Sequence, residues 1–222
     1  MKLEGRTLSI LKNFATINPS IMFKPGDVLK TISPNRTILA RAKLKEEVEG
    51  QFAIFDLSKF LSVMSLFEKP QFAVQEKFMT ISDGQQKVNY TFADPSAIVV
   101  APDKTPQIPE PEIQFKLTGA TLDRVQKAMG VLKMPEIAVT GDGSDVFLEA
   151  IDMKNPSGDK FAIKVGETAH TFRMIFKAEN IKVINGDYDV SISSKGISHF
   201  VGEDVEYWIA TEATSTFTKG AE

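Results

Sequence analysis

Apolar residues recur every three or four positions in two segments of this chain, and this spacing predicts two amphipathic helices. The first covers residues 6–17 and ends before Pro19, because the residue preceding a proline disfavours the α-helical region. The second covers residues 121–133 and ends before Pro135. Two shorter helices are predicted at residues 56–67 and 177–182.

Short apolar or alternating runs between turn residues predict strands in the rest of the chain. In the first half they are residues 21–23, 28–32, 37–42, 52–55, 72–75, 78–82 and 87–92. In the second half they are residues 113–117, 136–140, 146–151, 161–165, 171–176, 188–192, 197–201 and 205–210. The polar tail, residues 212–222, is expected to fray. Strands that follow one another through short links, with few helices, indicate an α+β fold of antiparallel sheets with the helices on one face.

The same plan of elements occurs twice. In residues 55–61 an apolar strand closes, and Asp56, a suitable N-cap, opens a short helix that is followed by three strands. Residues 176–182 repeat this arrangement, and a longer amphipathic helix precedes it in each half. A protein built from repeated units often takes its function from the assembly that the units form.

Proline is concentrated between the two copies. Five of the eleven prolines lie between Pro95 and Pro111. Proline lacks a backbone donor and fixes φ, so this stretch suits neither a central strand nor a helix interior. The sequence therefore predicts two domains, residues 1–93 and 112–222, joined by an extended connector, residues 94–111.

Composition narrows the class of protein. A chain of 222 residues with 42% apolar and 25% charged residues is typical of a globular protein with one large or two small domains. No run approaches the roughly 18 apolar residues of a membrane helix, and the N-terminus does not resemble a signal peptide. The absence of cysteine excludes disulfides and thiolate chemistry and fits an intracellular protein.

No reactive constellation of an enzyme is present. The chain has no phosphate-binding glycine loop ending in Lys-Ser or Lys-Thr and no His-Glu-x-x-His motif. The two histidines, His170 and His199, lack a partner at ligand spacing and are read as strand residues. The segment around Asp142 and Asp145 has the wrong spacing for a calcium loop and is read as a turn. We therefore predict a protein that is not an enzyme and has no metal or cofactor.

Charge is distributed unevenly. The net charge of −3 argues against a generic nucleic-acid binder. The helical segments 4–17, 56–68, 119–133 and 177–182 nevertheless hold eight basic and five acidic residues, a net of +3, which leaves −6 for the rest of the chain. Either these cations occupy solvated helix faces, or they form a face that attracts phosphates without reading bases.

Two stretches of the sequence are specific enough to suggest a family. One is the opening Met1-Lys2-Leu3 leading to Leu11-Lys12-Asn13-Phe14-Ala15-Thr16-Ile17-Asn18 and then Ile21-Met22, and the other is Ala93-Asp94-Pro95-Ser96 running into Val99-Val100-Ala101-Pro102. In these stretches the chain resembles the DNA polymerase sliding clamps of tailed bacteriophages. The duplicated plan of elements extends it over the whole chain.

The resemblance implies a clamp fold with sheets outside and two helices of each domain on an inner face. Three chains would form a homotrimeric ring around duplex DNA and tether the replicative DNA polymerase for processive synthesis. It also implies opening by an ATP-dependent clamp loader, use by late transcription factors, no membrane and a location in the cytoplasm of the infected bacterial host.

Three groups of site residues follow from the resemblance. The cations expected to face DNA are Lys12, Lys59, Arg124, Lys127, Lys133, Lys177 and Lys182. The residues expected to line a pocket for partner peptides are Ile98, Val99, Val100, Ile108 and Trp208. The residues expected at the subunit interface, on two sheet edges, are Lys87, Val88, Tyr90, Phe92, Phe161, Ile163 and Val165.

Two other classes of function compete with this hypothesis. One is a structural β-rich oligomeric phage protein whose basic helices are incidental. The other is a hydrolase with an unrecognised site, which the lack of any reactive set of residues disfavours.

Overall fold

A computed structural model describes residues 3–220. Met1 and Lys2, which belong to the opening segment quoted above, lie outside the described residues, as do the last two residues. The chain forms two compact units, Met1–Thr105 and Pro106–Glu222. Within residues 3–220 no helix is long and apolar enough to cross a membrane.

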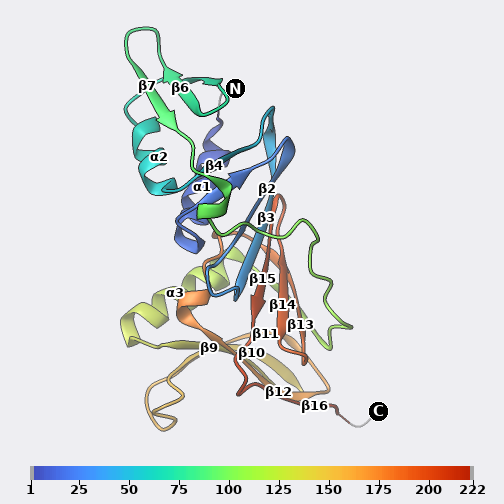
Figure 1. Ribbon diagram of the computed structural model, residues 1–222. Coiled ribbons are helices and arrows are strands. Elements are labelled where there is room, and N and C mark those ends of the chain that lie inside the picture. The colour runs from blue at the N-terminus through green and yellow to red at the C-terminus, as the bar shows by residue number, and fades with distance from the viewer. Residues whose placement is uncertain (1–2, 221–222) are drawn as a thin grey trace. The chain divides into compact units, whose positions relative to one another are not determined.

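The first unit combines two helices with three groups of strands (Figure 1). Its elements are α1 (Gly5–Ile17), β1 (Ile21–Phe23), β2 (Gly26–Ile32), β3 (Ile38–Val48), β4 (Phe52–Ile54), α2 (Leu57–Met64), β5 (Gln71–Val74), β6 (Phe78–Ser82), β7 (Lys87–Thr91) and the 3-10 turn η1 (Pro95–Ala97). Strand β1 pairs with β4, β2 pairs with β3, and β5, β6 and β7 form a meander, all antiparallel.

The helices of the first unit pack against each other and against its strands. Helix α1 contacts α2, β2 and β3, and it buries Ile10, Leu11 and Phe14 completely. Helix α2 begins where the Asp56 side chain accepts a hydrogen bond from the Lys59 backbone N–H at 2.8 Å. The helices predicted at residues 6–17 and 56–67 are confirmed, because their apolar spacing matches the face that they bury.

The second unit consists mainly of antiparallel strands with one α-helix. Its elements are β8 (Ile113–Leu117), α3 (Gly119–Leu132), β9 (Glu136–Asp142), β10 (Asp145–Ile151), β11 (Phe161–Glu167), β12 (Thr171–Lys177), the 3-10 turn η2 (Ala178–Asn180), β13 (Tyr188–Ser193), β14 (Ile197–Val201), β15 (Val205–Ala210) and β16 (Thr216–Thr218). One sheet has the order β11-β10-β9-β12-β16, and β15-β14-β13-β8 follow one another in a second. Helix α3 packs against β10 and β11.

The α+β class and the antiparallel sheets are confirmed, but the short helix predicted at residues 177–182 is not formed. Lys177 still belongs to β12, where it pairs with Glu136, and only the three-residue turn η2 follows. No side chain caps this turn, and Asn180 is buried. A segment this short cannot repay the cost of nucleating an α-helix.

Strand β3 extends furthest beyond its predicted range, and strand β16 was not predicted. Strand β3 continues to Val48 because buried Ala42, Leu44 and Val48 alternate with charged exposed residues. The tail predicted to fray contains β16, which pairs with β12. The Phe217 ring stacks on Phe172 with centroids 6.2 Å apart. This ring contact and the backbone pairing together hold this part of the tail on the sheet.

Replacing Asp56 with alanine should lower the free energy of unfolding by about 1 kcal/mol, because the N-cap of α2 is lost. Urea unfolding followed by circular dichroism measures this change. Ser58→Ala, an exposed position in the first turn of the same helix, is the matched control and should change the free energy by less than about 0.5 kcal/mol. Equal effects of the two substitutions would contradict a capping role.

Candidate interaction surfaces

The exposed faces of α1 and α2 carry hydroxyl residues and one lysine each. Lys12 is exposed on α1 together with Ser9 and Thr16. Lys59 is exposed on α2 together with Ser58. Because the opposite faces of both helices are buried, these lysines are held on the solvent side by the same periodicity that forms the core.

Helix α3 presents three of the predicted cations. Arg124 and Lys127 are exposed, and Lys127 forms an ion pair with Asp123 at 2.7 Å, four residues earlier. Lys133 is the exposed C-cap residue in the left-handed conformation, with φ of 55°. The Lys127 ion pair offsets part of the positive charge of this helix.

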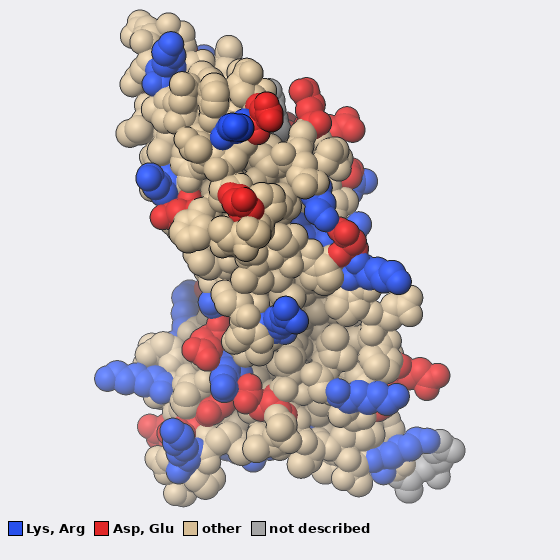
Figure 2. Space-filling model, in the orientation of Figure 1, with Lys and Arg blue, Asp and Glu red and all other residues tan. Residues whose placement is uncertain are grey.

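The remaining two predicted cations do not lie on an α-helix. Lys177 is the last residue of β12, and its Nζ lies 3.9 Å from Glu212 Oε2. Lys182 follows η2 and is half-buried. The prediction that these two lysines lie on a helix was therefore wrong, although Lys177 is exposed. Figure 2 shows positive and negative side chains interspersed on the face drawn there.

Both strands predicted at a subunit interface are edge strands. Strand β7 is the outermost strand of the order β5-β6-β7, and β11 is the outermost strand of β11-β10-β9-β12-β16. Among the described residues, β7 pairs only with β6 and β11 pairs only with β10. Each strand therefore has one side on which its backbone N–H and C=O groups can pair with another strand.

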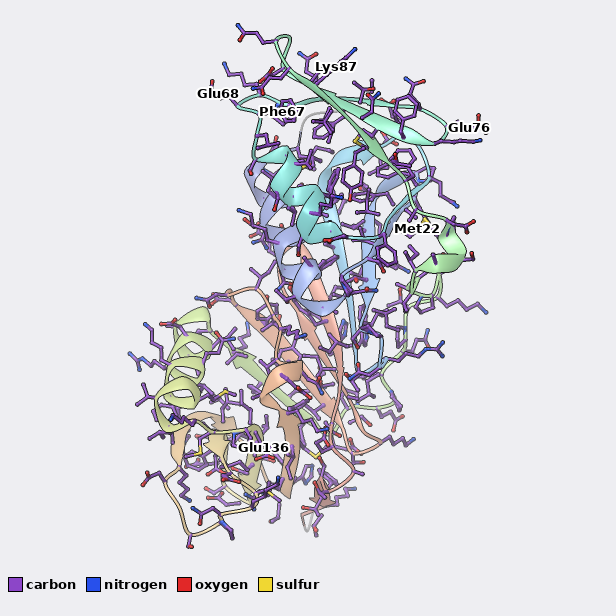
Figure 3. All side chains as sticks on the ribbon, turned by 60° about the vertical axis from the view of Figure 1, so that its left-hand side comes forward. Met22, Phe67, Glu68, Glu76, Lys87 and Glu136 are labelled. Atoms are coloured by element: carbon purple, nitrogen blue, oxygen red, sulfur yellow. The ribbon has the colours of Figure 1, made fainter. Side chains whose placement is uncertain are left out.

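The predicted residues on β7 are supported from their own unit. The Tyr90 hydroxyl donates to the Asp56 carbonyl at 3.1 Å, and its ring meets Phe60 edge-on at 5.2 Å. Burial, and secondarily the Asp56 carboxylate, raises the pKa of Tyr90. Phe92 stacks on Phe52 at 4.8 Å. Val88 is half-buried, whereas Lys87, labelled in Figure 3, is exposed.

Strand β11 alternates half-buried apolar and exposed residues. Phe161, Ile163 and Val165 are half-buried, and Ala162 and Lys164 are exposed. Lys164 forms an ion pair with Asp145 at 2.6 Å, and this hydrogen bond raises the pKa of Lys164. A neighbouring strand would complete the burial of the apolar side chains at this edge.

A cavity of about 410 Å³ lies beside the start of the connector in the first unit. It is lined by Met22, Lys24, Pro25, Val28, Lys30, Arg41, Val100, Ala101, Asp103 and Thr105. Of the five predicted pocket residues, Val100 lines this cavity. The residues from β2 and β3 were missed because they lie far from the connector in sequence, and no local pattern marks them.

The other predicted pocket residues lie outside the lining of this cavity. Val99 is exposed and Ile98 is half-buried. Ile108 belongs to the second unit and is half-buried. Trp208 is 4% exposed, and its ring lies flat against His199 with centroids 4.3 Å apart. The indole is therefore packed within its own sheet.

Solved structures with the same fold are DNA clamps. The chain superimposes on proliferating cellular nuclear antigen (PCNA) from Thermococcus kodakaraensis with a TM-score of 0.71 at 13% identity, over 96% of this chain and 99% of that chain. It matches A. fulgidus PCNA with a TM-score of 0.70 at 15% identity, over 97% and 98% of the two chains. The protein therefore has the DNA clamp fold.

Sequence comparisons identify the family. Residues 2–100 match the model described as DNA polymerase processivity factor, and residues 114–213 match that of the gp45 sliding clamp, C terminal. The sliding clamp of Vibrio phage KVP40 is 36% identical over 96% of this chain and 100% of its own length. That of Enterobacteria phage T4 is 30% identical over 97% and 99%. The chain belongs to the phage sliding clamps, a family of non-enzymatic polymerase processivity factors, and the resemblance is confirmed.

Proposed function

We propose that three copies of this chain close head to tail into a ring around duplex DNA and tether the replicative polymerase. The observation that carries this proposal is that each unit ends a sheet with an open edge strand, β7 in one unit and β11 in the other. Pairing β7 of one copy with β11 of the next is a contact between two different surfaces. Such a contact gives a ring if its rotation closes and a filament if it does not.

The subunit interface of the proposal combines backbone pairing with apolar contact. Its residues are Lys87, Val88, Tyr90, Phe92, Phe161, Ile163 and Val165. The half-buried members from the two edges would cover each other, which also removes two aggregation-prone edges. Tyr90 and Phe92 are held in place by their own unit, so they need little reordering to form the contact.

The DNA-facing surface of the proposal consists of the cations already described, six of them exposed and Lys182 half-buried. Its residues are Lys12, Lys59, Arg124, Lys127, Lys133, Lys177 and Lys182. Phosphate contacts from lysine and arginine are independent of base sequence and are weakened by salt. A ring holds DNA by enclosing it, so such contacts can be weak enough to permit sliding.

Partner proteins complete the proposal. A clamp loader that binds ATP itself opens the ring, and the polymerase and late transcription factors bind the closed ring in the cytoplasm of the infected bacterium. The solved A. fulgidus PCNA is bound to the C-terminal region of FEN-1, which supports docking of a chain terminus on a clamp. We place the docking region at the connector, around Ile98, Val99 and Val100 of the first unit; Ile108 and Trp208, the other two candidates, belong to the second unit.

A pair of engineered cysteines tests the ring. The natural chain has no cysteine, so Asn89→Cys on β7 and Ala162→Cys on β11 introduce the only two thiols. A short bismaleimide should yield covalent dimers and trimers and no larger species, and sedimentation should give the mass of a trimer. Ala73→Cys on β5, the opposite edge of the same sheet, replaces Asn89→Cys in the control and should give monomer. A monomeric mass at tens of micromolar would overturn the ring.

Charge reversal tests the DNA-facing surface. The double variant Lys12→Glu with Arg124→Glu should reduce loader-dependent primer extension about tenfold or more, with an unchanged circular dichroism spectrum. Lys43→Glu with Lys116→Glu makes the same change in net charge on strands β3 and β8 and should retain processivity. Equal processivity of both double variants would contradict the assignment of Lys12 and Arg124 to the DNA-facing surface.

Retention on DNA separates the clamp from a structural phage protein. A clamp loaded on circular DNA should remain bound and should be released when the DNA is linearised. Retention that is independent of DNA topology would favour the structural alternative.

A further inference from the structure

The cavity beside the connector has a cationic lining in an acidic chain. Three of its residues, Lys24, Lys30 and Arg41, are basic, and Asp103 is its one carboxylate, which leaves a net charge of +2 against −3 for the whole chain. The rest of the lining is largely apolar, including Met22, which is labelled in Figure 3. This mixture suits a segment that carries both carboxylates and apolar side chains.

The connector supplies oxygen partners for two of these cations. Lys24 Nζ lies 2.5 Å from Asp103 Oδ1. Lys30 Nζ donates to the Asp103 carbonyl at 2.6 Å and lies 3.5 Å from the Thr105 hydroxyl. The hydrogen bond from Lys24 lowers the pKa of Asp103, so this carboxylate is charged at neutral pH. One short stretch of connector thus engages both lysines.

These contacts are exchangeable. The Lys24 and Asp103 side chains are 41% and 84% exposed, and an ion pair this accessible to water contributes little to stability. By contrast, the buried Asn18 side chain donates to the carbonyls of Val99 at 3.1 Å and Ile32 at 2.9 Å. The connector is therefore fixed at Val99, whereas the Asp103 region is held through exposed groups.

We propose that an acidic, apolar segment of a partner protein binds in this cavity and that its carboxylate displaces Asp103 from Lys24 and Lys30. Asp103 is then an internal competitor that sets the affinity for partners. This inference rests on the proposed function, because it specifies the chemistry of the segment that docks at the connector. A neutral apolar segment would displace Asp103 without replacing the ion pair that Asp103 makes with Lys24.

Two peptide probes test the inference on the full-length protein. One is a fluorescein-labelled decapeptide with two aspartates beside leucine and phenylalanine, and its twin has asparagine in place of aspartate. Fluorescence anisotropy should show about tenfold tighter binding of the aspartate peptide, with a preference that falls as salt increases. Equal binding of the two peptides, or binding of neither, would overturn the inference.

Substitutions separate the internal competitor from a structural ion pair. Asp103→Asn should tighten binding of the aspartate peptide about threefold, because the competitor is gone. Lys24→Met with Lys30→Met should abolish the preference for aspartate. Lys43→Met, which removes a lysine of β3 outside the cavity lining, should change neither affinity. Weaker binding by Asp103→Asn would overturn the competitor role.

The controls distinguish this inference from the ring itself. Sedimentation mass and retention on circular DNA are measured on the same preparations. A trimer that is retained on circular DNA but does not prefer the aspartate peptide refutes the cavity assignment alone. A monomer that prefers the aspartate peptide refutes the ring alone. A single-stranded oligonucleotide that competes with the peptide through Lys24 and Lys30 would assign these cations to nucleic acid and overturn the proposal.

Discussion

Backbone hydrogen bonding at the edges of antiparallel sheets is the constraint on which this structure depends. Every paired strand described here is antiparallel, and short links join most of them. In such sheets the inner strands form backbone hydrogen bonds on both sides, whereas the outermost strand forms them on one side only. In this chain β7 and β11 occupy such positions, one in each unit. The unpaired backbone groups of these two strands link the fold of one chain to the assembly proposed for three chains.

The long helices are amphipathic, with one face buried within their own unit and the other exposed to solvent. Helix α1 buries one continuous apolar face, and its other face keeps Ser9, Lys12 and Thr16 exposed. Helix α3 follows the same rule over β10 and β11. In the proposed ring, which would enclose its ligand, modest electrostatic attraction is enough, and the few cations exposed on these helices would supply it. The acidic remainder of the chain is consistent with a surface that does not bind DNA.

The connector illustrates how one segment can have two kinds of attachment. At Val99 it is fixed through the buried Asn18 side chain, and at Asp103 it is held by a solvent-accessible ion pair with Lys24 and a hydrogen bond from the half-buried Lys30. A site closed by its own carboxylate can select partners by charge without a large change in the fold, because exposed ion pairs exchange at low cost.

The sequence by itself determined the two long helices, the short helix α2 and most of the strands, since local apolar periodicity and turn residues specify them. It did not determine η2 or β16, because three-residue elements depend on what they pack against: Asn180 of η2 is buried, and Phe217 of β16 stacks on Phe172 of β12. The resemblance supplied the candidate cations and edge residues, and the structure located them in particular elements. Only the tertiary structure brought Lys24, Lys30 and Arg41 beside Asp103, and only it buried Trp208. Cavities join residues that are distant in sequence, and no local pattern encodes which of them meet.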